Sequence, residues 1–358
     1  MRAPVAPRAD LVALEGYHSP QLDVSVRLNT NESPYPPPPE FVEAWLDALR
    51  GIPLNRYPDR AARDLRVALG RHLGQPVERL FCANGSNEVL QTLLLTYGGP
   101  GRKALVFEPT YALHAHISRI TGTEVVTAER GDGFAVDVDA ARRAIERNQP
   151  EIVLLCSPNN PTGTLDDPGL ASALAGAGAG LVVVDEAYGE FADHSAIDTV
   201  GDDDRVVVAR TYSKVWSMAS LRLGFCVAPP SVVAELEKVV LPYHLAAPTQ
   251  LAGLVALRFG AEMDARVQRL CDERERLAAT LASVDGVTVY PSGANFVLVE
   301  AAGDGHDLWQ RLVDRGVLVR DFSRWPRLDD CLRITIGTPA ENDAFVDALR
   351  DALQEVPV

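Results

Sequence analysis

Three short, mostly apolar runs that are rich in valine, leucine and isoleucine constrain the fold of this chain more than any other feature. They span residues 152–157, 181–184 and 205–211, and each run ends at polar residues. Continuous apolar runs of this length are typical of strands that are buried on both faces of a parallel sheet. Strand-like and helix-like segments alternate from about residue 40 to residue 259. The pattern predicts an α/β fold whose large domain holds a mostly parallel, doubly wound sheet.

The third run is followed by Lys214, one of only three lysines in a chain that has thirty-one arginines. Arginine serves almost everywhere that a positive charge suffices. A lysine at this place therefore indicates a need for a primary amine, because a guanidinium stays protonated whereas a desolvated amine can become a nucleophile. We interpret Lys214 as a candidate for a Schiff base with an aldehyde cofactor. The alternative is a surface lysine without a chemical role.

Residues near this lysine and near residue 85 suit a phosphate group. Ser213 offers a hydroxyl, and Arg222 offers a planar fork of N–H groups that can contact a phosphate in a bidentate manner. Gly85, Ser86 and Asn87 open an apolar helix, where free amides and the helix dipole attract anions. Simple capping of that helix by Ser86 or Asn87 is the alternative explanation.

Polar side chains also follow the other two apolar runs. Asp185 ends one of them, and a carboxylate there could keep a ring nitrogen protonated, while Tyr188 could hydrogen-bond a phenolic oxygen. The other run leads into a segment at residues 158–163 whose two prolines restrict the backbone, so that Asn160 can present its amide to a ligand. Open α/β sheets bind ligands at the carboxyl ends of their strands, so we expect one shared site. Solvated turns are the alternative for both segments.

The order of these motifs resembles that of the fold-type I pyridoxal-phosphate aminotransferases, and among them the histidinol-phosphate aminotransferases. The resemblance covers nearly the whole length of the chain, and six or more motifs in one order are far more specific than any single motif. Further matching segments are residues 28–34, 56–59, 109–111, 241–245, 294–297 and 332–338.

The resemblance implies a role for each candidate residue. Lys214 would hold pyridoxal 5′-phosphate as a Schiff base and then move a proton, so that Lys214, Asp185 and Tyr188 form the catalytic set. Tyr57 would reach the cofactor from the second subunit of a homodimer. The implied cofactor contacts within one subunit are Gly85, Ser86, Asn87, Tyr111, Asn160, Asp185, Tyr188, Ser213, Lys214 and Arg222.

The implied substrate site contains Arg333, which stands where ordinary aminotransferases bind a carboxylate. Here it would bind a substrate phosphate, with help from Arg320 and Tyr17, because two guanidinium forks favour a dianion. The implied reaction interconverts L-histidinol phosphate plus 2-oxoglutarate and imidazole-acetol phosphate plus L-glutamate, a step of histidine biosynthesis. An aromatic amino acid aminotransferase is the first alternative, and a lyase for phosphorylated amino acids is the second. The same segment offers three alternatives to Arg320: Arg315, Arg324 and Arg327.

Composition and charge narrow the class of protein further. A formal net charge of −15 argues against nucleic acid or an anionic membrane as a partner. Residues 1–10 lack an apolar signal-peptide core, and the weakly apolar stretch at residues 170–184 is too short to cross a bilayer. Five cysteines without paired spacing indicate reduced thiols, and His114 and His116 supply at most two metal ligands. We expect a cytoplasmic protein without a metal site.

The pattern along the chain predicts two domains. Residues 261–281 form a long charged and apolar segment that is typical of a helix leading to a second lobe. We expect a large cofactor-binding domain at residues 40–260, and a small α+β domain that joins residues 261–358 to an N-terminal arm at residues 1–39.

Two other protein classes fit this outline less well. A nicotinamide dehydrogenase needs a glycine-rich turn between a strand and the following helix, whereas Gly176 to Gly180 precede a strand. A ligand-sensing module would not need a reactive amine, and the chain shows no basic or helix-turn-helix segment for such a module to control.

Overall fold

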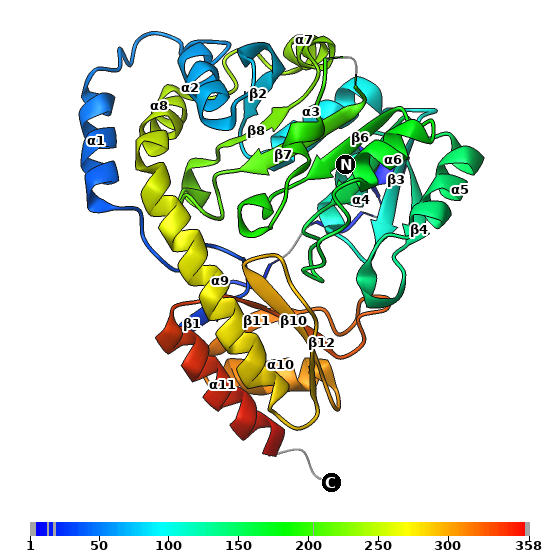
Figure 1. The fold of residues 1–358 in the computed structure, drawn as a ribbon, viewed down its shortest axis with the longest axis vertical. Helices are drawn as coiled ribbons and strands as arrows, with labels where there is room; N and C mark the ends of the chain where they lie inside the picture. Colours follow the sequence, from blue (N-terminus) through cyan, green and yellow to red (C-terminus); the bar gives the residue numbers. More distant parts are fainter. Residues whose placement is uncertain (1–4, 13, 17–18, 203, 355–358) are drawn as a thin grey trace.

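Two β-sheets organise the protein in the computed structural model, which describes residues 5–12, 14–16, 19–202 and 204–354 (Figure 1). A seven-stranded sheet has the strand order β2-β8-β7-β6-β5-β3-β4, and a five-stranded sheet has the order β1-β11-β12-β10-β9. The long helix α9 (Gly260–Ala282) runs from the neighbourhood of the first sheet to the second (Figure 1). It is one residue longer at each end than the predicted helix.

The seven-stranded sheet is almost entirely parallel, which confirms the predicted fold class. Only β8 runs antiparallel to its neighbours β2 and β7. The carboxyl ends of the other six strands therefore meet at one edge of the sheet. The strands are β2 (Leu80–Ala83), β3 (Lys103–Glu108), β4 (Glu124–Glu129), β5 (Ile152–Cys156), β6 (Leu181–Asp185), β7 (Val206–Thr211) and β8 (Gly224–Val227).

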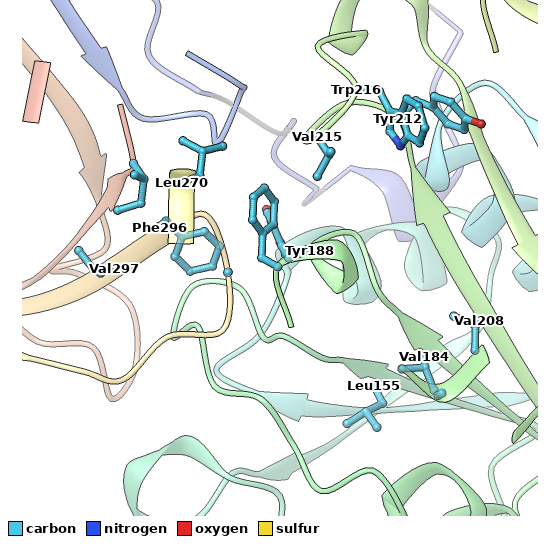
Figure 2. Close-up of a cluster of buried hydrophobic side chains, with 14 of the residues drawn as sticks. Leu155, Val184, Tyr188, Val208, Tyr212, Val215, Trp216, Leu270, Phe296 and Val297 are labelled. Atoms are coloured by element: carbon cyan, nitrogen blue, oxygen red, sulfur yellow. The ribbon is translucent and has the colours of Figure 1, made fainter. Parts of the chain in front are cut away.

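Every residue of β5, β6 and β7 is buried, as their continuous apolar sequences predict. Alternate side chains of each strand enter different cores, and Figure 2 shows Leu155, Val184 and Val208 from neighbouring strands in the larger one. Helices cover both faces, as expected for a doubly wound sheet. They include α2 (Arg63–Leu73), α5 (Val138–Asn148) and α6 (Leu170–Gly176) on one face and α3 (Ser86–Tyr97), α4 (Ala112–Ile120) and α7 (Pro230–Val239) on the other.

The five-stranded sheet joins the two ends of the chain. Its strand β1 (Val26–Leu28) pairs in parallel with β11 (Val317–Asp321), which brings the N-terminal segment to the C-terminal lobe. In addition, β11 pairs with β12 (Cys331–Thr335) so that Arg320 lies opposite Arg333. The remaining elements there are β9 (Val287–Val289), β10 (Phe296–Ala301), α10 (Gly305–Asp314) and α11 (Pro339–Gln354).

The predicted division into domains at residues 39/40 and 260/261 stays a prediction. Each of these two boundaries falls one residue after the start of a helix. Helix α1 (Pro39–Arg50) and helix α8 (Ala247–Ala256) contact each other, and α9 begins at Gly260. Among the described residues, no helix combines the length and the apolar character needed to cross a membrane.

Candidate active site

A cavity of about 350 Å³ lies at the edge of the seven-stranded sheet where the parallel strands end. Its walls come from the segments that follow β2, β3, β5, β6 and β7, and from residues 30–32 of the N-terminal segment. The topology therefore gathers polar residues that are far apart in the sequence, from Ser86 to Arg333. The predicted residues that line this cavity are Ser86, Asn87, Tyr111, Asn160, Asp185, Tyr188, Ser213, Lys214, Arg222 and Arg333.

Lys214 presents its amine to this cavity three residues after β7 ends. The Nζ atom donates a hydrogen bond to the backbone carbonyl of Thr30 at 3.0 Å. Burial disfavours the charged ammonium, and the neighbouring charge of Arg333 acts in the same direction, so the pKa of Lys214 falls to about 8. A substantial fraction of the amine is therefore unprotonated and nucleophilic at mildly alkaline pH.

Asp185 is held at the end of β6 by a buried histidine. His114 on α4 approaches the Asp185 Oδ2 atom with its Nε2 atom at 3.1 Å, and the Ala187 amide donates to Oδ1 at 3.1 Å. His114 and Asp185 are each only 1% exposed. These contacts fix the orientation of the carboxylate, which lines the cavity and can face a cationic ring nitrogen.

Tyr188 is the centre of a buried hydrogen-bonded group. Its hydroxyl oxygen accepts from the Asn31 amide at 2.9 Å and from the Asn160 amide at 3.3 Å. Burial raises the pKa of Tyr188, so the phenol stays protonated and can itself donate. The ring also packs edge to face on Phe296 of β10, with the centroids 5.0 Å apart (Figure 2).

The start of α3 forms a tight cradle with Arg222. Gly85 has a φ of +81°, which strongly favours glycine, and a Cβ atom at this position would lie 2.5 Å from Nη2 of Arg222 and displace the guanidinium. The Nη1 atom of Arg222 donates to the Ser213 hydroxyl at 3.1 Å. Gly85 is the N-cap residue and provides no side-chain cap, which makes capping by Ser86 or Asn87 the wrong explanation. Uncapped amides beside a guanidinium and a hydroxyl suit a phosphate.

Asn87 and Tyr111 meet at one side of the same cavity. The Tyr111 hydroxyl donates to the Asn87 Oδ1 atom at 3.3 Å, and the Tyr111 ring packs edge to face against His114 at 5.6 Å. The ring of Tyr111 therefore has a defined position at the cavity wall.

Arg333 enters the site from the five-stranded sheet. It donates from Nη1 to the Asn160 Oδ1 atom at 2.5 Å and from Nη2 to the Asn29 carbonyl at 2.7 Å. Its guanidinium also lies over the rings of Phe296 and Phe322. This buried arginine fixes the Asn160 amide, and through it the hydrogen bond to Tyr188.

Arg320 lies opposite Arg333 in the strand register and lines a smaller cavity of about 20 Å³. That cavity shares Tyr111, Asn160 and Arg333 with the larger one, so the two are adjacent. The other three arginines of the segment behave differently. Arg315 donates to the carbonyl of Arg311, Arg327 donates to the carbonyl of Arg130, and Arg324 is exposed.

Two further predicted site residues are Tyr57 and Tyr17. Tyr57 does not line this cavity, is 79% exposed, and stacks on Tyr243 with ring centroids 4.5 Å apart. Its predicted contribution to a second subunit stays a prediction. Tyr17 lies outside the described residues.

Sequence reasoning missed three contributors to the site. Thr30 and Asn31 reach the site because the preceding strand β1 pairs with β11 in the C-terminal lobe. The segment at residues 28–34 matched the aminotransferase family, but its residues gave no chemical reason to place them in the site. His114 was interpreted as structural, since nothing in the sequence connects it with Asp185. The helical position three residues after Tyr111 is the one local signal, because it turns both side chains to the same side.

Comparison with known proteins gives a consistent picture. Residues 24–349 match the family model of class I and II aminotransferases. The histidinol-phosphate aminotransferase of Thermobifida fusca is 46% identical over 352 residues, which cover 96% of this chain and 95% of that protein. The one of Streptomyces avermitilis is 45% identical over 97% of this chain and 96% of that protein. The crystal structure of the Sinorhizobium meliloti histidinol-phosphate aminotransferase, in complex with pyridoxal-5′-phosphate, has a TM-score of 0.85 at 26% identity, covering 93% of this chain and 92% of that one.

The lowered pKa of Lys214 can be measured directly, since the chain has only three lysines. In the protein without added ligand, carbon-13 NMR of reductively methylated lysines should give a midpoint near 8 for Lys214. Arg333→Gln should raise the Lys214 midpoint, because a neighbouring positive charge is lost, whereas Arg324→Gln should not. A wild-type Lys214 midpoint at the usual lysine value of about 10.4 would contradict the assignment.

Proposed function

This chain belongs to the class I and II aminotransferase family, and on that premise we propose that it is a pyridoxal-phosphate-dependent histidinol-phosphate aminotransferase. The proposed reaction interconverts L-histidinol phosphate plus 2-oxoglutarate and imidazole-acetol phosphate plus L-glutamate. Identities of 45–46% to relatives of that name over nearly the whole chain support the assignment. The observation that carries it is the single cavity in which the Lys214 amine, the Asp185 carboxylate and the start of α3 come together.

The residues of the cavity fit pyridoxal phosphate in charge and shape. Gly85 leaves room for Arg222 beside the uncapped start of α3, as a phosphate requires. Tyr188 and Asn160 offer hydrogen-bonding groups for the ring oxygen, and Tyr111 offers a ring face. When bound, the cofactor supplies an aldehyde and an electron-withdrawing pyridinium ring that stabilises negative charge on the substrate carbon.

The catalytic residues have separate tasks in this proposal. Lys214 Nζ, with a pKa of about 8, would accept a proton from the substrate carbon and deliver it to the cofactor carbon on the other side of the shared nitrogen. Asp185, held in place by His114, presents a negative charge to the ring nitrogen. Tyr188, held by Asn31 and Asn160, orients the ring through its oxygen.

Substrate selection is assigned to the two arginines that face each other across β11 and β12. Arg333 and Arg320 provide two planar forks at adjoining cavities, which is enough to surround a phosphate dianion. The acidic protein, with a net charge of −15, needs such a local positive cluster to attract an anionic substrate. We propose that Tyr17 adds a hydroxyl to this phosphate site.

We also propose that the enzyme is a cytoplasmic homodimer in which Tyr57 completes the partner's phosphate site. Tyr57 and Tyr243 stack on the surface, and the nearby chain positions Leu54 and Leu241 are 90% and 76% exposed. Exposed apolar groups of this kind are typical of protein interfaces.

Borohydride treatment of the cofactor-loaded enzyme should link the cofactor permanently to Lys214, because reduction of an imine leaves a stable secondary amine. Peptide mass spectrometry identifies the labelled lysine. Lys214→Ala should bind the cofactor without a covalent bond and lose turnover. The matched change Lys238→Ala, on the exposed face of α7, should keep the covalent link to Lys214 and the turnover. A label on Lys103 or Lys238 would refute the role of Lys214.

Arg320→Ala should raise the Michaelis constant for histidinol phosphate more than that for phenylalanine, because the second fork mainly serves a dianion. Loss of one charge-assisted contact of this kind costs about 1.5–3 kcal/mol. Half-reaction rates with both substrates measure the difference, and Arg324→Ala removes the same charge from an exposed neighbour as the control. Equal losses with both substrates would favour an aromatic amino acid aminotransferase.

Mixing two inactive variants tests the contribution of Tyr57 across the dimer. A dimer of one Lys214→Ala chain and one Tyr57→Ala chain would hold one intact and one doubly damaged site. Under subunit exchange and limiting cofactor, about a quarter of all sites should be intact, so activity should exceed the sum of the two samples. Replacing the second chain by a Lys214→Ala/Tyr57→Ala chain should abolish the gain. Strictly additive activity in proven mixed dimers would remove Tyr57 from the neighbouring site.

A further inference from the structure

A second cavity, of about 280 Å³, lies behind the loop that carries Lys214. It is bounded by α2, α9, β8, the end of β7 and the short 3-10 turn Gly189–Phe191. It shares no lining residue with the candidate active site. Val215 and Trp216, the two residues that follow Lys214, form part of its wall, so the cavity and the active site lie on opposite sides of one loop.

Two polar atoms at this cavity are buried and have no hydrogen-bond partner among the described residues. They are the hydroxyl of Tyr212, whose side chain is 1% exposed, and the Oε2 atom of Glu190. Buried polar side-chain atoms in folded proteins are nearly always hydrogen-bonded. Two such atoms lining one cavity therefore leave two hydrogen-bonding positions that a molecule bound there can fill.

The charges around the cavity favour a cation. Arg210 donates from Nε and Nη2 to Glu186 at 3.1 and 2.8 Å, and also from Nη2 to the Ser195 hydroxyl at 2.9 Å. The carboxylates of Glu186 and Glu190 thus share one guanidinium, which leaves an excess of one negative charge when both are ionised. Besides Glu190, the cavity is lined by a second acidic residue, Asp264, which is exposed. His72, also exposed, is a further titratable residue of the lining.

Burial by itself opposes the charge on Glu190. It raises the pKa of this carboxyl group, and the nearby Arg210 charge and a hydrogen bond from the Trp216 side chain offset that effect only in part. A second positive charge in the cavity would supply the compensation that Arg210, already bound to Glu186, does not supply in full.

Aromatic rings form much of the inner wall. Tyr212 and Trp216 lie side by side with centroids 4.9 Å apart, as Figure 2 shows, and Phe225 packs against Tyr212 at 6.2 Å. The ring of His72 meets the edge of Trp216 at 6.0 Å. The faces of such rings attract organic cations and pack well against planar groups.

We propose that this cavity is a binding site for a small, planar organic cation with N–H donors, of the amidinium or protonated imidazole type. The cation pairs with the Glu190 carboxylate, lies against Trp216 and Tyr212, and contacts the Tyr212 hydroxyl. This site is separate from the catalytic cavity and does not depend on the proposed reaction.

Benzamidinium is a suitable probe, because it is planar, keeps its charge over a wide pH range and offers paired N–H donors to a carboxylate. Calorimetric titration of the cofactor-loaded protein should show one site per chain. Benzamide, which has a similar shape and no charge, should bind at least about tenfold more weakly. Glu190→Gln should weaken benzamidinium binding at least about tenfold, and Tyr212→Phe should weaken it severalfold. The matched control Asp347→Asn removes one acid from the exposed face of α11 and should have no effect.

A second readout protects the test against a variant that does not fold. Benzamidinium should change the tryptophan fluorescence of the wild-type protein, and Trp216→Phe should abolish this change while the other three tryptophans remain. Three results would overturn the proposal: no saturable binding of benzamidinium to the wild type, equal affinities for benzamidinium and benzamide, or wild-type affinity in Glu190→Gln.

Discussion

The hydrogen bonds that converge on Tyr188 hold the two lobes and the N-terminal segment together at the site. Asn31 reaches Tyr188 from the N-terminal segment, Asn160 reaches it from the loop after β5, and Arg333 ties Asn160 to the five-stranded sheet. These groups are buried, so each lost partner would leave a polar atom without compensation. The position of the catalytic groups therefore depends on contacts among residues that are up to 304 positions apart.

Three predicted residues that the structure brings to one cavity share one property. Asp185, Asn160 and Lys214 each follow a continuous apolar run, and the fully buried strands β5, β6 and β7 place such positions at one edge. Gly85 was predicted from a different local signal, namely the glycine and small polar residues that open the apolar helix α3. Local pattern and general sheet topology were enough for these four residues.

The remaining site residues depend on pairings that local patterns do not contain. Asn31 lies at the site because β1 pairs with β11, almost three hundred residues away in the sequence. The hydrophobic pattern of neither segment predicts that pairing. His114 reaches Asp185 from helix α4, 71 positions earlier in the sequence. The alternation of strands and helices was enough to predict the fold class. The antiparallel direction of β8 was not predictable, because the short polar segment between β7 and β8 does not by itself determine the direction of the next strand.

Helix α9 is a single helix of 23 residues that runs from the seven-stranded sheet to the five-stranded sheet. At 1.5 Å per residue it is about 35 Å long. It contains no proline, and its only glycine is the first residue, so it lacks the usual causes of a kink. Any movement of one sheet relative to the other must be taken up at the ends of this rod. The five-stranded sheet would then swing as a rigid lever, and Arg320 and Arg333, which it carries, would travel together with their spacing unchanged.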